Sequence, residues 1–170
     1  MEEALNLIKK RRSVRKYVQG KVPPDEYILK IIEAGIWAPS GLNNQPWRFV
    51  IVKESKVKNE LAKLTRYSKI IEEAPLLIAV FLDKERMYHQ IKDHQSAGAC
   101  LQNMMLMATA LGLGTCWLGE ILKNEDKVKE VLGLDKEKYE LCAILSIGYP
   151  ADNTPRKGRN PLESFILKTI

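Results

Sequence analysis

The sequence has few of the residues that build metal centres or disulfide frameworks. Its 170 residues include two histidines and three cysteines, and the cysteines form no CxxC pair. An odd number of cysteines within apolar stretches is typical of reduced core residues. His89 and His94 lie five positions apart, a spacing that does not place both on one face of a helix. We therefore expect neither a disulfide scaffold nor a metal site.

Familiar catalytic and nucleotide-binding motifs are also missing. No GxGxxG or GxxxxGK(S/T) loop indicates a dinucleotide-binding or P-loop fold, and no GxSxG turn presents a nucleophilic serine. The first ten residues lack the long apolar run of a secretory signal. The uncharged stretch 95–119 is long enough to span a bilayer, but its amides and four glycines favour a core helix. We expect a cytoplasmic protein that does not enter a membrane.

What the chain does contain is an ordinary globular composition with an excess of positive charge. Apolar residues make up 45% and charged residues 28%, which predicts a single domain over residues 1–170 without a linker. Twenty-seven Lys and Arg against twenty-one Asp and Glu give a formal charge of +6 and a pI near 9.2. Such a balance suits a polyanion or a small anionic ligand, and charge alone does not separate these two.

Hydrophobic periodicity predicts an alternation of helices and strands. Helices are expected over residues 25–38, 55–67, 94–111 and 124–132, the second capped by Ser55 and the last by Asn124. Strands are expected over residues 47–52, 76–81, 115–118 and 140–148, with 76–81 at the centre of a sheet because it is apolar throughout. Only one helix separates the first two strands and no regular βα series follows, so the pattern favours an α+β fold.

Positive charge is densest over residues 9–16, where a first short helix ends. In a helix Arg11 and Arg15 would share a face, and in a strand Arg11, Ser13 and Arg15 would do so. Either conformation aims both guanidinium groups one way, and guanidinium binds phosphate through two parallel hydrogen bonds. The segment is suited to gripping an anion, and a basic surface facing solvent is the simpler alternative.

Two uncharged segments are suited to bordering a flat ligand. Residues 38–47 combine two prolines with small and amide side chains, which fits the polar edge of a heterocycle but also a simple turn. Residues 112–120 hold glycines that allow a close backbone approach to a ring. Trp37 and Phe49, in contrast, are expected to have a structural role, in core or subunit packing. Each of these signals is weak alone.

Taken together and in order, residues 11–15, 39–47, 98–106, 112–120 and 156–162 resemble the nitroreductase family. The resemblance implies a nitroreductase-like three-layer α+β fold, with a mixed, mostly antiparallel central sheet flanked by helices. It also implies non-covalently bound FMN, reduction by NADH or NADPH in a ping-pong cycle, and a nitroaromatic, quinone or similar small acceptor. The expected assembly is a homodimer with FMN at the subunit interface.

The resemblance assigns the FMN-binding residues at the two ends of the chain by position. Those matching the phosphate site are Arg11, Ser13 and Arg159, with Lys157 as a secondary candidate. Arg12 matches a position beside the ribityl chain, and Arg15 matches the cation near flavin N1 and O2. The resemblance thus gives the basic segment and the C-terminal region one shared ligand.

The resemblance assigns the ring-binding residues in the same way. The loop that the family supplies from the other subunit corresponds to Pro39, Ser40, Gly41 and Asn43, with Gln45 at its base. The backbone segment against one flavin face corresponds to Trp117, Leu118, Gly119 and Glu120, with an N–H near Gly119 addressing N5. Because FMN carries the electrons, no catalytic acid or nucleophile is expected from the protein.

Two other functions remain open from the sequence. The same scaffold resembles flavin enzymes specialised for dehalogenation or flavin fragmentation, and only Tyr88 and His89 mark the segment 84–94 that would cover a substrate. A small nucleic-acid-binding module is a different class, in which nucleic-acid phosphates would replace that of FMN. Against it, lysines and arginines are spread along the chain and no nucleic-acid motif is present, so we expect no nucleic-acid partner.

Overall fold

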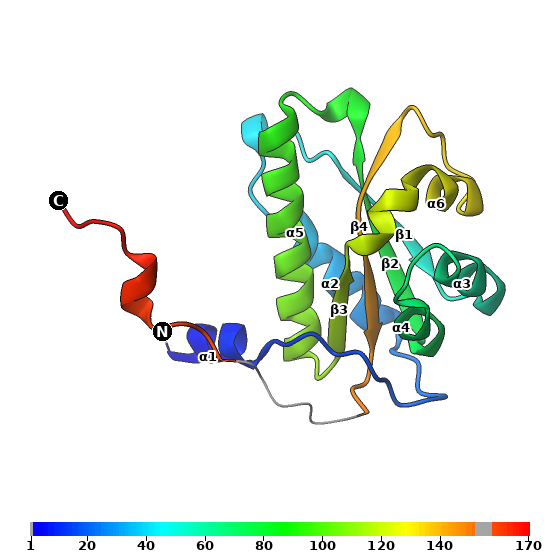
Figure 1. Cartoon of the computed structure of the whole chain (residues 1–170), viewed down its shortest axis with the longest axis horizontal. Coiled ribbons are helices and arrows are strands. Elements are labelled where there is room, and N and C mark those ends of the chain that lie inside the picture. Colours follow the sequence, from blue (N-terminus) through cyan, green and yellow to red (C-terminus); the bar gives the residue numbers. More distant parts are fainter. Residues whose placement is uncertain (1, 152–157) are drawn as a thin grey trace.

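Four apolar segments pair into one antiparallel sheet (Figure 1). The computed structural model describes residues 2–151 and 158–170. Within them the strands are β1 (Trp47–Val52), β2 (Leu76–Asp83), β3 (Gly114–Leu118) and β4 (Tyr139–Gly148), in the order β1-β2-β4-β3. All eight residues of β2 are buried, which confirms the expected central strand, covered on both faces.

Helices cover both faces of this sheet and give three layers. The α-helices are α1 (Glu2–Lys10), α2 (Asp25–Ile36), α3 (Ser55–Ala62), α4 (Ser68–Glu73), α5 (Gln90–Ala110) and α6 (Glu125–Val131). Short 3-10 turns are η1 (Gly41–Asn43), η2 (Lys84–Arg86), η3 (Glu120–Asn124) and η4 (Leu162–Phe165). Because side chains alternate along a strand, Ile78 and Val80 of β2 pack with α2 and α5, whereas Leu77 and Phe81 pack with α3, α4 and α6. The expected three-layer α+β fold is confirmed.

The pairing of the sheet departs from a regular ladder in two places. Neighbouring strands all run antiparallel, and the parallel part expected of a mixed sheet is confined, among the described residues, to a bridge between Ser13 and Thr115. In the pairing of β2 with β4, Val80 lies opposite Ala143 and Phe81 opposite Leu141. The residue between them, Cys142, is therefore the extra residue of a β-bulge, which redirects its side chain.

Three local predictions are wrong. The helix expected over 55–67 ends at Ala62, and α4, which was not expected, begins only at Ser68. Ser55 lies inside α3, with Glu54 at the capping position. Asn124 occupies the first position before α6, but its side-chain amide donates to the Leu64 carbonyl at 2.8 Å instead of capping the helix. It thereby fixes the α3–α4 connection.

Tyr17 fastens the N-terminal segment to the sheet. Its side chain is buried, and its hydroxyl lies 2.7 Å from Ser146 Oγ and 2.9 Å from the Val14 carbonyl oxygen. Burial raises the pKa of the Tyr17 phenol, so the hydroxyl stays neutral and keeps its proton for these bonds. The Val18 N–H adds a bond to the Tyr149 carbonyl at 2.9 Å. The residues just before Tyr17 are therefore held against β3 and β4.

Replacing Tyr17 by Phe is expected to lower the free energy of unfolding by about 1–3 kcal/mol, because Ser146 Oγ and the Val14 carbonyl lose a buried partner. Urea unfolding followed by circular dichroism measures the change. Tyr67→Phe is the matched control, since Tyr67 is 39% exposed. Equal losses in the two variants would show that the Tyr17 hydroxyl does not anchor the segment.

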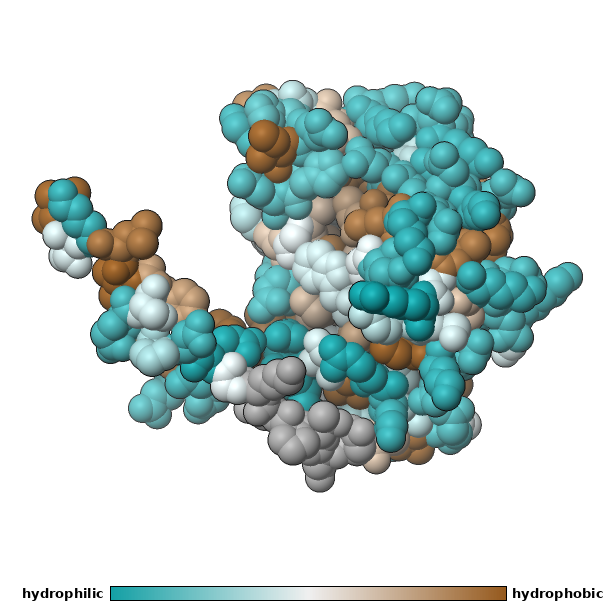
Figure 2. Space-filling view, viewed as in Figure 1, coloured by the Kyte–Doolittle hydropathy of each residue, from teal (hydrophilic) through white to brown (hydrophobic). Residues whose placement is uncertain are grey.

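The chain ends in an exposed C-terminal arm, residues 158–170, which projects away from the three layers (Figure 1). Figure 2 shows that hydrophobic surface gathers on this arm. The exposed apolar side chains there are Leu162, Phe165, Ile166, Leu167 and Ile170. Apolar surface of this kind marks a site of interaction. None of the helices within residues 2–151 and 158–170 is both long and apolar enough to cross a membrane.

Candidate functional site

The basic segment, residues 11–15, lies beside the first residues of β3. Ser13 forms a parallel bridge with Thr115, and the Val14 N–H donates to the Thr115 carbonyl at 2.8 Å. Val14 is buried, and Gly114 leaves the space for it, because a Cβ at Gly114 would lie 2.5 Å from Val14 Cγ2. Helix α1 has ended at Lys10, so the segment pairs like a strand, one of the two alternatives expected from the sequence.

The polar groups of the basic segment remain accessible to a ligand. Arg11, Arg12 and Ser13 are half-buried, and Arg15 is exposed. Within the described part of the chain, no salt bridge joins Arg11 or Arg15 to a carboxylate. The Thr115 hydroxyl is buried there without a hydrogen-bond partner. A buried unpaired hydroxyl next to Ser13 is the kind of group that an anionic ligand satisfies.

β3 leads from the basic segment to the second predicted group, residues 117–120. Trp117 is 41% exposed, whereas Leu118 is buried in the core. A Cβ at Gly119 would meet only the Trp117 indole, at 3.8 Å or more, so the backbone there is open to an approaching ring. Gly119 lies four positions beyond Thr115, just past the end of β3, which places the two groups about 13 Å apart along one sheet edge.

The side chain of Glu120 anchors this second group to the body of the protein. Its Oε2 accepts hydrogen bonds from the Thr65 hydroxyl at 2.6 Å and the Arg66 N–H at 3.1 Å, and its Oε1 pairs with Lys123. The hydrogen bond from Lys123, followed by that from Thr65, lowers the pKa of Glu120 to about 2. The side chain thus ties η3 to the α3–α4 connection, and the backbone of Glu120 is what remains for a ligand.

Replacing Glu120 by Gln is expected to destabilise the protein at neutral pH and to matter less in acid. Because the folded pKa lies below the ordinary value of 4.5, the carboxylate contributes stability above about pH 4.5, and this is lost as the pH falls through about 2. Urea unfolding over this range measures the change, with Glu163→Gln in the exposed arm as the control. A wild-type advantage that stays constant down to pH 2 would contradict the anchoring role.

The amide loop, residues 39–45, has an uncommon backbone. Leu42, Asn43 and Gln45 have φ angles of 53°, 55° and 45°, in the left-handed region that residues other than glycine rarely adopt. The Asn43 N–H donates to the Ser40 carbonyl at 3.1 Å, and the Gln45 N–H donates to Ser40 Oγ at 3.2 Å. Such backbone persists where its surroundings fix it, and it concentrates at ligand sites.

The amide loop lies at the opposite end of α5 from the basic segment (Figure 1). Asn44 Nδ2 donates to Asp93 Oδ1 at 2.7 Å, in the first turn of α5. The basic segment pairs with β3 just after α5 has ended. Because α5 has 21 residues, the separation is about 30 Å. One chain therefore brings together the basic segment and residues 117–120 but leaves the amide loop apart.

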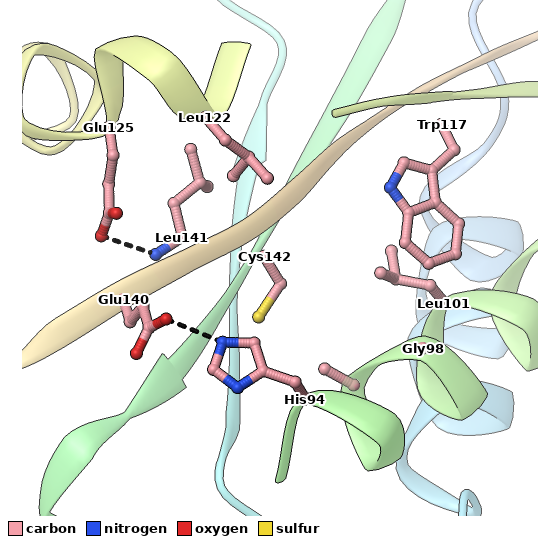
Figure 3. A pocket seen from close by; sticks show the side chains of 10 residues that line it. His94, Gly98, Leu101, Trp117, Leu122, Glu125, Glu140, Leu141 and Cys142 are labelled. Atoms are coloured by element: carbon pink, nitrogen blue, oxygen red, sulfur yellow. Dashed lines mark hydrogen bonds and ion pairs between the residues drawn. The ribbon is translucent and has the colours of Figure 1, made fainter. Parts of the chain in front are cut away.

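Sequence reasoning missed a cavity of about 280 Å³ between α5, β3 and β4 (Figure 3). His94 and Trp117 line it from different elements, and His94 Nε2 lies 2.7 Å from Glu140 Oε1. Burial alone would lower the pKa of His94, but hydrogen bonds to the Gln90 carbonyl and to Glu140 outweigh it and raise the pKa. His94 lies in α5 and Glu140 in β4, 46 positions later in the sequence, so no local sequence motif indicates that they form a pair.

The cysteines supply no nucleophile to this region. Cys142 lines the cavity from the β-bulge, and burial raises the pKa of its thiol to about 12, as it does for Cys100. Both thiols therefore stay protonated at neutral pH. All three cysteines are free, and Cys100 and Cys116 are buried in the core as expected, whereas Cys142 is half-buried. In the described part of the chain no three His, Cys, Asp or Glu side chains cluster as metal ligands.

Two predicted phosphate ligands come from the C-terminal region. Lys157 lies outside the described residues. Arg159 is exposed near the start of the C-terminal arm, and its Nη1 donates to the Gly158 carbonyl at 3.1 Å. The arm projects away from the three layers (Figure 1). The role of Arg159 beside Ser13 therefore stays a prediction.

Comparison with known proteins decides the family. The model of the nitroreductase family matches residues 8–67 and 56–149. The chain belongs to the nitroreductase family. A protein from Archaeoglobus fulgidus, provisionally named an NADH dehydrogenase/NAD(P)H nitroreductase, is 34% identical over 156 residues, which cover 89% of this nitroreductase and 88% of the relative. The resemblance inferred from the ordered sequence fragments is confirmed.

Solved structures extend the match to three dimensions. A provisionally named nitroreductase from Desulfovibrio desulfuricans, in complex with FMN, is 45% identical with a TM-score of 0.92, covering 98% of this chain and 96% of its own. The NADPH:FMN oxidoreductase of Vibrio harveyi, in complex with NAD+, is 25% identical with a TM-score of 0.88, covering 98% of this chain and 76% of its own. This nitroreductase therefore shares its fold with proteins solved with FMN and with NAD+.

Proposed function

We propose that this nitroreductase is an FMN-dependent NAD(P)H oxidoreductase that reduces nitroaromatics, quinones or similar small acceptors by two electrons. The observation that carries the proposal is the sheet edge at β3, with the basic segment at one end and the open backbone of Gly119 at the other. The relative named as an NAD(P)H nitroreductase and the structure solved with FMN support the choice of donor and cofactor.

The basic end of this edge fits the phosphate of FMN. Ser13 and the buried, unpartnered Thr115 hydroxyl are hydrogen-bonding groups, and Arg11 adds a charge-assisted pair. Each hydrogen bond to a charged group contributes about 1.5–3 kcal/mol. In the proposal Arg12 borders the ribityl chain, and Arg159 with Lys157 adds positive charge at the phosphate.

The other end of the edge fits the ring system of FMN. In the proposal the backbone of residues 117–120 packs against one face of the ring and Arg15 lies near N1 and O2, where a fixed cation stabilises the reduced form. When bound, FMN supplies the redox chemistry by accepting hydride from NADH or NADPH and passing the electrons on. The protein's residues bind and orient, so no acid or nucleophile is required. One open face then serves donor and acceptor in turn, which gives ping-pong kinetics.

We propose that a second copy of the chain completes each site. The amide loop and the basic segment of one chain lie about 30 Å apart along α5, too far to border the same end of one ligand. Trp37 and Leu42 are 80% and 86% exposed, and the C-terminal arm exposes further apolar side chains. A symmetric partner that buried these surfaces would also bring its amide loop to the site.

The visible spectrum after FMN addition and gel filtration tests the proposal. We expect retained yellow absorbance that bleaches anaerobically with NADH or NADPH and returns when a nitroaromatic or quinone is added. Steady-state rates at several donor concentrations should give parallel double-reciprocal lines. Retained flavin that neither nicotinamide reduces would remove the oxidoreductase assignment, and a colourless protein would remove FMN binding.

A further inference from the structure

Asp93 is a fully buried carboxylate that the proposed chemistry does not use. Its side chain is 0% exposed in the first turn of α5. Oδ1 accepts from Asn44 Nδ2 at 2.7 Å, and Oδ2 accepts from the Tyr88 N–H at 3.0 Å and the His89 N–H at 2.8 Å. Burial alone would raise the pKa of Asp93, but these three bonds outweigh it and lower the pKa, so the group is ionised at neutral pH.

These hydrogen bonds join two segments that are distant in the sequence. Asn44 belongs to the amide loop, whereas Tyr88 and His89 end the lid segment, residues 84–89, which runs from η2 to α5. Asn44 Nδ2 also donates to the Arg86 carbonyl at 3.0 Å. The side-chain amide of Asn44 therefore donates both to the lid segment, at the Arg86 carbonyl, and to α5, at Asp93. The Asp93 carboxylate is the acceptor that the amide loop and the lid segment share.

Tyr88 packs on the same junction. A Cβ at Gly41 would lie 2.0 Å from Tyr88 Oη, so position 41 accommodates glycine alone while the phenol stays in place. Beyond Gly41 the amide loop turns through the left-handed backbone of Leu42, Asn43 and Gln45. A backbone of this kind needs neighbours that fix it, and Asp93 and Tyr88 lie on the elements that do so.

We propose that Asp93 is a positioning residue that fixes the amide loop and the lid segment as one unit. The inference rests on the proposed function, because it makes this unit the part of each chain that borders the partner's flavin. An ionised carboxylate suits the role, since it accepts three hydrogen bonds and offers none. An asparagine has the same size but carries an NH₂ group in place of one oxygen. Whichever way it lay, this donor would face another donor, either the Asn44 amide or the backbone N–H groups of Tyr88 and His89.

Amide hydrogen exchange of the cofactor-free protein tests the positioning directly. In Asp93→Asn, exchange across residues 40–45 and 87–89 is expected to quicken about tenfold, while β2 keeps its protection. Asn44→Ala removes the hydrogen bonds that the amide loop makes through Asn44 and leaves those from the Tyr88 and His89 N–H groups to Asp93. Residues 40–45 should therefore exchange faster while Tyr88 and His89 stay protected. Ile71→Ala, in the core on the opposite face of the sheet, controls for general destabilisation.

FMN titration by fluorescence tests the consequence for the site. The FMN dissociation constant is expected to rise about tenfold in Asp93→Asn and in Asn44→Ala, the effect of losing about one hydrogen bond that orders the loop. The two effects should not add in the double variant, because both changes break the Asn44–Asp93 bond and only the Asn44–Arg86 bond is lost in addition to those lost in Asp93→Asn. Ile71→Ala should leave the dissociation constant unchanged.

The two measurements separate this inference from the proposed function. A wild-type protein that binds no FMN defeats the proposed function, while hydrogen exchange still decides whether Asp93 fixes the two segments. Where the wild type does bind FMN, unchanged exchange in Asp93→Asn overturns the inference, and so does faster exchange with unchanged affinity. If Asp93→Asn does not fold, Asn44→Ala decides through the same two measurements.

Discussion

Gly114→Ala is expected to lose both stability and FMN. The new Cβ would lie 2.5 Å from Val14 Cγ2 and 2.6 Å from Val14 Cβ, and the second contact is not relieved by rotating the side chain. Overpacking of this kind costs about 1–3 kcal/mol. The clash is relieved only if Val14 moves away from β3, and the adjacent Ser13 would then move with it. FMN affinity is therefore expected to fall roughly tenfold to a hundredfold, the loss of one charge-assisted hydrogen bond.

Urea unfolding and fluorescence titration with FMN measure the two effects of Gly114→Ala. Gly98→Ala is the matched control for stability, because a Cβ at this position in α5 meets nothing within 4 Å. Since glycine is unfavourable inside a helix, that variant should be more stable by about 0.5–1 kcal/mol. A Gly114→Ala protein that is less stable but binds FMN as the wild type does would show that the basic segment does not hold the phosphate.

The elements that were predictable from the sequence are those with a strong local pattern. The strand expected over 47–52 agrees with β1 at both ends, because a segment that is apolar except for Arg48 is bounded there by Pro46 and Lys53. α4 was missed because its only buried apolar residues, Ile70 and Ile71, are adjacent and define no helical period. α5 begins at Gln90, before the expected residue 94, since polar residues of its first turn bond to neighbouring segments, as Asp93 does.

The candidate site was predictable where residue type alone carries the chemistry. Arginines beside a serine suit anion binding in either conformation, and the structure adds that Ser13 pairs with Thr115. Asp93 gave no such signal, because its partners are one amide and two backbone N–H groups that no sequence spacing relates. The cavity at Cys142 depends on a shift of register by one residue within β4, which hydrophobic pattern does not encode.

Two variants that each lose FMN are expected to recover it when they share a dimer. Arg11→Ala/Arg15→Ala removes two cations from the basic segment. Asn43→Val places a β-branched residue at a φ of 55° and distorts the amide loop. Each variant alone should retain little flavin after gel filtration. Co-expression with two different affinity tags, followed by purification through both, yields the mixed dimer, whose ratio of flavin to protein absorbance is then measured.

The flavin content of the mixed dimer reports which chain supplies each part of the site. If each site takes its basic segment from one chain and its amide loop from the other, one site carries both lesions and the other carries neither, so half of the wild-type flavin returns. If one chain supplied both parts, each site would carry one lesion and no flavin would return. The separation of about 30 Å along α5 favours the first outcome, because no single chain brings its own amide loop to its own basic segment. A colourless mixed dimer would therefore show that each site takes its amide loop and its basic segment from the same chain, which would overturn the two-chain site. An Asn43→Val protein that retains its flavin alone would remove the amide loop from the flavin site.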